Sequence, residues 1–165
     1  MVNDVSGLTH DPEMAGLVAD KGCPVVLMHL RGTPATMADH AHYSDLFGEV
    51  ADELAVRARA ALDAGVHPSR ILLDPGIGFA KDSPASRALV EGAGAFRALG
   101  FALLVGPSRK SFLDPSGLLA PADRDAATFE AALTCVRQGV AVLRLHHGRE
   151  WGFIRKVARA REVFA

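Results

Sequence analysis

Cysteine is scarce in this sequence. Cys23 and Cys135 are the only two, and each lies among apolar residues far from the other. Their spacing fits neither a zinc site nor a disulfide framework, so we expect reduced thiols in a cytoplasmic protein. No apolar run approaches the roughly 20 residues of a membrane-spanning helix. The first seven residues have no basic segment and no long apolar stretch, so we expect no signal peptide there.

An excess of charge of one sign is also absent. The net charge is −1, with 22% charged and 49% hydrophobic residues, which is ordinary for a soluble globular protein. This balance gives no reason to expect nucleic acid or an anionic membrane as a partner. A length of 165 residues is enough for one sizeable core. We therefore expect a single domain over residues 1–165.

Short apolar runs alternate with segments of helical periodicity along the chain. In the longest helical segment, Leu46, Val50, Leu54 and Ala58 recur at a spacing of four residues. Strands that are apolar throughout and alternate with helices are typical of a parallel sheet with covered faces. The expected strands span 2–5, 24–28, 70–73, 101–105 and 140–145, and the expected helices span 12–21, 43–64, 84–99, 122–137 and 150–164.

Polar side chains gather where each expected strand ends. In a β/α barrel these ends lie on one face, which carries the active site. We therefore predict an α/β fold, a partial TIM-type (β/α)8 barrel of about five β/α units with parallel strands. A doubly wound five-stranded sheet is the alternative, which the clusters at the strand ends favour less. The clusters are Asn3-Asp4, His29–Arg31, Asp74, Ser108–Lys110 and Arg144–His146.

The number of units falls short of a closed barrel. Such a barrel has eight strands in about 250 residues. About three units, on the order of 100 residues, would precede Met1 in a complete barrel. We therefore expect a domain that is N-terminally incomplete relative to the full barrel, with its remainder supplied by further chain or by a partner.

The segment 72–79, Leu-Leu-Asp-Pro-Gly-Ile-Gly-Phe, puts a carboxylate directly after a buried strand. The Pro-Gly pair and the second glycine turn the chain sharply. Asp74 could present a rigid acceptor to a ligand, or it could cap the following turn through its own backbone. The segment alone leaves both interpretations open.

The strand-end groups complement one another as a ligand site. Asp74 offers a fixed anionic acceptor and Asn3 an amide, which suit the N–H-rich edge of a flat heterocycle. Lys110 is a point donor, and Arg144 could stack on a ring or hold a phosphate. His146 lies two residues on and faces the same side, so it suits a diphosphate together with Arg144.

Ser111 follows Lys110 at an expected helix start, where backbone N–H groups favour a carboxylate. The inferred ligands are therefore a heterocycle, a phosphate group and a second, carboxylated molecule. His10, His40, His42 and His67 show no ligand spacing and are expected at the surface. Arg109 is expected to be structural.

The order of these motifs resembles that of the dihydropteroate synthases, the folate-pathway enzymes that sulfonamides inhibit. The resemblance covers nearly the whole chain and corresponds to the later five strands of that family. It rests on the segments Asn3–Gly7, Met28–Gly32, Asp74–Lys81, Gly106–Phe112 and Arg144–His146.

The resemblance implies a transferase that joins p-aminobenzoate to (7,8-dihydropterin-6-yl)methyl diphosphate and releases diphosphate. It places Asn3, Asp74 and Lys110 on the pterin, with Met28 and Gly106 in the same pocket. The family's catalytic positions correspond to Lys110, Arg144 and His146, with Arg144 stacked on the ring and His146 on the diphosphate. Phe79, Lys110 and Ser111 would shape the aminobenzoate site.

The resemblance also implies Mg²⁺ as a cofactor, whose ligand in the family lies in a loop without a counterpart here. It further implies a homodimer that forms through helices 122–137 and 150–164. His147 stands where the family usually has an acid after the histidine, and 82–87 depart from its usual Thr and His-Asn. Two alternatives remain open: a non-catalytic pterin-binding remnant, and a domain like the methyltransferases that move a methyl group from a folate to a corrinoid.

Overall fold

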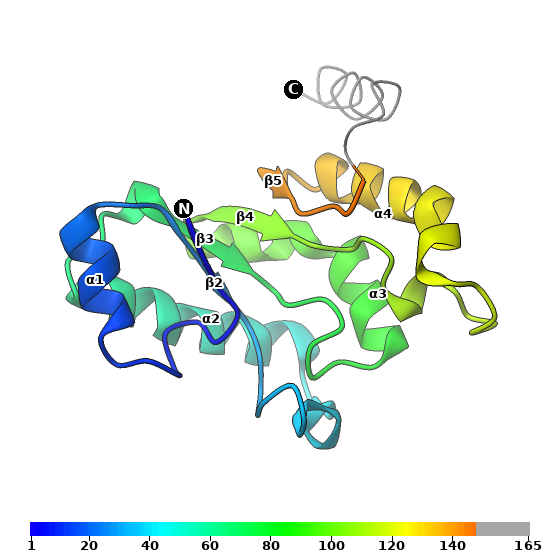
Figure 1. The fold of residues 1–165 in the computed structure, drawn as a ribbon, viewed down its shortest axis with the longest axis horizontal. Coiled ribbons are helices and arrows are strands. Elements are labelled where there is room, and N and C mark those ends of the chain that lie inside the picture. The colour runs from blue at the N-terminus through cyan, green and yellow to red at the C-terminus, as the bar shows by residue number, and fades with distance from the viewer. Residues whose placement is uncertain (148–165) are drawn as a thin grey trace.

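Five parallel strands form one sheet in the computed structural model, which describes residues 1–147 (Figure 1). Each strand pairs with the next one along the chain, giving the order β1-β2-β3-β4-β5. A doubly wound sheet reverses its strand order at a switch point. The order found here has no reversal, so the sheet is an arc of a β/α barrel. The strands are β1 Val2–Asp4, β2 Val25–Met28, β3 Ile71–Asp74, β4 Ala102–Val105 and β5 Val142–Leu143.

Helices connect the strands and cover one face of the sheet. The longest, α2, packs Val50 and Leu54 against the strands, and both side chains are fully buried. The α-helices are α1 Met14–Lys21, α2 Leu46–Asp63, α3 Ser83–Glu91 and α4 Asp125–Arg137 (Figure 1). Short 3₁₀ turns are η1 Met37–His40, η2 Pro68–Arg70, η3 Ala93–Leu99, η4 Ser111–Leu113 and η5 Pro121–Arg124.

The strands are apolar on both faces because each face has its own cluster. Leu27, Leu73 and Leu103 belong to the large core under the helices. Their neighbours in sequence point the other way, and a smaller cluster of Val26, Leu72, Leu104 and Val142 lines the inner, concave side of the arc. This explains why the strands read as continuous apolar runs rather than as alternating ones.

Three α-helices begin later than predicted: α4 starts at Asp125 rather than at 122, because the 3₁₀ turn η5 precedes it, and α1 and α2 also start late. Asp45 caps α2 by accepting a hydrogen bond from the Gly48 backbone at 3.1 Å, so the helix starts at Leu46 rather than near Tyr43. Asp11 instead accepts from the Glu13 backbone at 2.9 Å, which closes a turn before α1. In both places a short acidic side chain competes with the helix for backbone donors.

The predicted helix over 84–99 is wrong in its second half. The α-helix ends at Gly92, and the chain continues as the 3₁₀ turn η3. A Cβ at Gly92 would lie 2.6 Å from the ring of Phe47, so only glycine fits beside that ring. The last strand is also shorter than predicted, and the predicted helix 150–164 lies outside the described residues.

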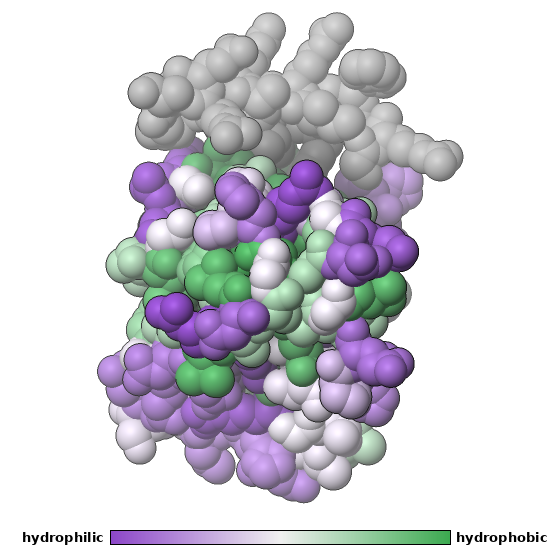
Figure 2. Space-filling model, turned by 90° about the vertical axis from the view of Figure 1, so that its left-hand side faces the viewer, coloured by the Kyte–Doolittle hydropathy of each residue, from purple (hydrophilic) through white to green (hydrophobic). Residues whose placement is uncertain are grey.

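The surface mixes polar and apolar groups. Figure 2 shows the end of the molecule that carries α1, where apolar patches lie mainly across the middle and polar side chains mainly below them. Leu17 on α1 is 53% exposed. Within residues 1–147, no helix is long and apolar enough to cross a bilayer. Cys23 and Cys135 are both free thiols.

The packing of α2 gives a stability prediction. Leu54 is fully buried between α2 and the sheet, whereas Val56 on the same helix is 70% exposed. Leu54→Ala should lower the free energy of unfolding by about 2–5 kcal/mol through lost burial and a residual cavity. Val56→Ala should change it by less than about 0.5 kcal/mol. Urea unfolding of the 165-residue chain measures both, and equal losses would contradict this packing.

Candidate functional site

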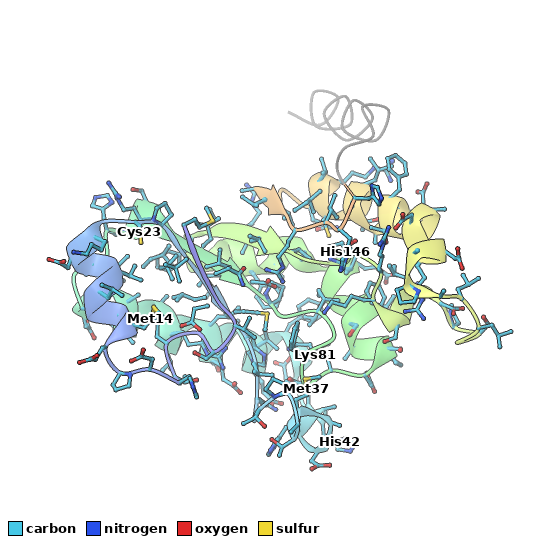
Figure 3. The ribbon with its side chains drawn as sticks, in the orientation of Figure 1. Met14, Cys23, Met37, His42, Lys81 and His146 are labelled. Carbon is cyan, nitrogen blue, oxygen red and sulfur yellow. The ribbon has the colours of Figure 1, made fainter. Side chains whose placement is uncertain are left out.

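A cavity of about 300 Å³ lies at the carboxyl ends of the strands. Residues at or after the end of each of the five strands contribute to it, so parts of the predicted polar clusters converge there. The predicted cluster His29–Arg31 does not line the cavity, because the side chains of His29 and Arg31 turn toward carboxylates of α2. Figure 3 shows His146 on the side toward which the strands run, opposite Met14 and Cys23. The lining residues are Asn3, Val5, Met28, Phe79, Gly106, Ser108, Lys110, Arg144, Leu145 and His146.

Asp74 ends β3 at the base of the site, and its side chain is fully buried. Oδ1 accepts a hydrogen bond from the Gly76 backbone at 2.8 Å. Oδ2 lies 2.9 Å from Nη1 of Arg144, but no N–H is well directed at it. Burial raises the pKa of Asp74, and Arg144 opposes this shift. The carboxylate therefore caps its own turn, as one of the two interpretations of the sequence had it, and its second oxygen is paired with Arg144.

Arg144 bridges the two ends of the arc. Its Nη1 donates to Oδ1 of Asn3 at 2.9 Å, besides its contact with Asp74. The guanidinium lies against Gly106, where a Cβ would come within 2.8 Å of Nη2. Gly106 is thus needed to make room for this side chain. A planar cation held between two acceptors is well placed to bind phosphate or stack on a ring.

Lys110 and Phe79 form one wall of the cavity. Nζ of Lys110 lies 4.2 Å from the centre of the Phe79 ring, a cation–π distance. Burial lowers the pKa of Lys110, and the nearby Arg144 cation adds to the shift. The ammonium and the ring together offer a surface for a planar ligand with acceptor atoms.

His146 is oriented by Ser108. The hydroxyl of Ser108 lies 3.0 Å from Nδ1 of His146 and accepts from the His146 backbone at 3.1 Å. Nδ1 is occupied, so Nε2 is the ring atom left for a ligand. Sequence analysis assigned no role to Ser108; its place two residues before Lys110 in the same strand-exit motif was the available signal.

Ser111 differs from the prediction. It begins η4, a 3₁₀ turn of three residues rather than a helix, and it is exposed outside the residues that line the cavity. A single turn carries little dipole, so the carboxylate argument does not hold at this position. His147 is also exposed. Arg109 is structural as expected, because its guanidinium pairs with both carboxylate oxygens of Asp125 at 2.7 and 2.8 Å.

A buried polar network below the cavity was not predicted. Nζ of Lys81 lies 2.8 Å from Nδ1 of His29 and donates to the Phe79 carbonyl at 2.9 Å. On the other side of the ring, Nε2 lies 3.1 Å from a carboxylate oxygen of Glu53, off the line of a hydrogen bond. Burial lowers the pKa of Lys81 to about 7. Burial, reinforced by Lys81, lowers the pKa of His29 to about 2.

Two arginines complete this network. Arg31 binds Glu49 and Glu53 and lies 4.2 Å from the ring centre of Tyr43. Arg57 is buried and donates to the carbonyls of Met28 and Leu30, the latter at 2.7 Å. The exit of β2, which carries Met28 into the cavity, is therefore fixed from below by α2.

The sequence profile of the pterin binding enzymes matches residues 1–146. The chain belongs to the pterin-binding enzyme family. The dihydropteroate synthase of Synechocystis sp. is 40% identical over 163 residues, covering 97% of this chain and 56% of the relative. That of Bacillus subtilis is 34% identical over 146 residues, covering 88% and 49%. The chain spans about half the length of these relatives.

Solved structures of the same family superpose closely. Dihydropteroate synthase from Thermus thermophilus in complex with 4-aminobenzoate gives a TM-score of 0.89 at 38% identity, covering 99% of this chain and 65% of that one. The Yersinia pestis enzyme with a sulfonamide drug complex gives 0.90 at 27% identity, covering 98% and 57%. This member of the family therefore shares the partial barrel predicted from its sequence.

The His29 environment gives a pH prediction. Folding holds the pKa of His29 near 2, whereas the unfolded chain protonates it near its ordinary 6.5. Between pH 5.5 and 4.5 the unfolded chain binds one more proton at this site, so the free energy of unfolding falls as pH falls. His29 contributes about 1.4 kcal/mol per pH unit to this slope.

In His29→Asn the slope should be shallower by about that amount, as measured by urea unfolding at several pH values. His42→Asn removes an exposed histidine instead and should keep the original slope. An unchanged slope in His29→Asn would show that the imidazole is not held neutral.

Proposed function

We propose that this chain acts as a dihydropteroate synthase, which condenses p-aminobenzoate with (7,8-dihydropterin-6-yl)methyl diphosphate to give 7,8-dihydropteroate and diphosphate. The observation that carries the proposal is the buried Asp74 carboxylate, whose Oδ2 is met by Arg144 at 2.9 Å, next to a cavity that this same arginine lines together with residues from all five strand ends. Such an acceptor suits a ligand edge rich in N–H groups.

The pterin would bind between Asp74 and Asn3. In the ligand-free site Arg144 spans these two acceptors. A pterin donating to Oδ2 of Asp74 would take over the position of the guanidinium, which could then lie over the ring face. Met28, fully buried at the end of β2, would form an apolar wall.

The chemistry is a displacement at the methylene carbon of the pterin. The amine nitrogen of p-aminobenzoate forms the new C–N bond, the C–O bond to diphosphate breaks, and the amine gives up one proton. The reaction mainly requires stabilisation of the negative charge that develops on the departing diphosphate. Arg144 and Nε2 of His146 would stabilise that charge. The rest of the rate enhancement would come from holding the two substrates in the right orientation, so a strong base is not required.

The second substrate would bind beside Phe79 and Lys110. The ring would pack on Phe79, and the Lys110 ammonium lies close enough to stabilise acceptor atoms of either substrate. Support comes from the Thermus thermophilus structures, which are complexes with 4-aminobenzoate and with 6HMPPP. Ser111 is exposed, so a contact with the carboxylate would be made at the rim of the site.

Magnesium is part of the proposal only through family resemblance. Within residues 1–147, no group of three or more His, Cys, Asp or Glu side chains could hold a metal ion. The residues present therefore do not fit Mg²⁺, and no step is assigned to it. A cytoplasmic location and a homodimer through α4 and the segment 150–164 likewise stay predictions.

A non-catalytic pterin-binding protein is the second candidate, favoured by the chain spanning about half the length of its relatives. Isothermal titration of the 165-residue chain with the dihydropterin diphosphate and Mg²⁺ tests both candidates. Binding followed by product formation with p-aminobenzoate supports the synthase, and binding without turnover supports the second candidate. Absence of binding by the folded chain would contradict both.

Two variants test the pterin site. Asp74→Asn keeps the size of the side chain but removes a buried anionic acceptor, so affinity for the dihydropterin diphosphate should fall by about a hundredfold. Lys110→Ala should weaken binding by about tenfold or more. Asp52→Asn, which changes an exposed carboxylate on α2, is the matched control. Wild-type affinity in both site variants would overturn the assignment.

A further inference from the structure

Lys81 lies beneath the cavity rather than in it. Lys81 is 8% exposed, and it is not among the residues that line the site. In Figure 3 it lies, like His146, toward the end of the molecule to which the strands run. The residue whose carbonyl Lys81 binds, Phe79, does line the cavity, so an effect of Lys81 on the reaction can pass through that residue.

The contacts of Lys81 join two walls of the site. One N–H of the ammonium donates to the carbonyl of Phe79 at 2.9 Å, and Nδ1 of His29 lies 2.8 Å from Nζ. His29 directly follows Met28, and its backbone N–H donates to the carbonyl of Asp74 at 2.8 Å. Lys81 therefore ties the loop that carries Phe79 to the exit of β2.

The loop needs such support because its backbone is strained. Ala80 has a φ of +49°, a left-handed conformation that a residue with a Cβ disfavours. The carbonyl before the Ala80 Cα and the carbonyl after it each accept a hydrogen bond from a side chain. Lys81 binds that of Phe79, and the hydroxyl of Tyr43 donates to that of Ala80 at 2.9 Å.

Stability alone does not account for a lysine here. The two groups that Lys81 contacts within hydrogen-bond distance, an imidazole and a carbonyl, are neutral; the Asp74 and Glu53 carboxylates favour its charge from further away, but its desolvation outweighs them. An apolar side chain of similar length would avoid that cost. What a lysine adds is a charge-assisted hydrogen bond, stronger than a neutral one, to the carbonyl of the residue whose ring faces the ligand.

We propose that Lys81 is a positioning residue, which fixes the Phe79 ring in the place where it packs against the aromatic second substrate. The inference rests on the proposed function, because it takes this second substrate to be p-aminobenzoate. Lys81 acts on the reaction only through Phe79, because the exit of β2 is held independently by Arg57.

The first test needs no ligand. Lys81→Met keeps the length of the side chain and removes the ammonium, and Lys21→Met, at an exposed lysine, is the control. Hydrogen exchange of the Phe79 amide, which donates to the Gly76 carbonyl at 3.0 Å, should become about tenfold faster in Lys81→Met. The Leu73 amide in β3 and the urea midpoint should not change. Unchanged exchange at Phe79, or equal acceleration at Leu73, would overturn the proposal.

The second test measures the reaction. Lys81→Met should raise KM for p-aminobenzoate about tenfold while changing the affinity for the dihydropterin diphosphate less than about twofold. In a Phe79→Ala background the same change should have no further effect on KM. Additive effects would show that Lys81 does not act through the ring. If the wild-type chain binds neither substrate, the proposed function fails, while the exchange experiment still decides whether Lys81 fixes Phe79.

Discussion

The site depends on one buried carboxylate at the end of the central strand. Asp74 is fully enclosed, and its charge is tolerable only because Gly76 donates to one oxygen and Arg144 lies near the other. The sharp turn brings Gly76 against the exit of β2, where a Cβ would collide with the His29 carbonyl. The position of this carboxylate thus fixes two neighbouring strand exits at once.

Polar groups are divided into two layers around that carboxylate. Above it, Asn3, Arg144 and Lys110 face the cavity. Below it, Lys81 and His29 belong to a network that reaches Glu53 on α2. The upper layer has the chemistry that a ligand requires, and the lower layer holds the loops that carry it. Burial affects the protonation of both layers: it lowers the pKa of Lys110 in the upper layer and the pKa values of His29 and Lys81 in the lower one.

The sequence predicted the upper layer better than the lower one. Strand ends in a parallel sheet share an edge, so Asp74, Lys110 and His146 could be placed together from their position after apolar runs. The partners of Lys81 come from β2 and from its own loop, and no local pattern links them. The break of the helix at Gly92 depends on the ring of Phe47, a contact 45 residues away in the chain. Local sequence patterns indicate where strands end and which positions of a helix share a face, but they do not indicate such distant contacts.

The pairing of Arg57 with the exit of β2 has a consequence for ligand selectivity. Its guanidinium donates to the carbonyls of Met28 and Leu30, so both carbonyls are directed toward α2. Met28 can therefore offer a ligand little more than its thioether side chain. A hydroxyl-rich molecule such as a sugar would lose its hydrogen bonds to water there without replacement, whereas the face of a flat aromatic ring would lose none. On this wall, the cavity presents an apolar side chain rather than backbone acceptors.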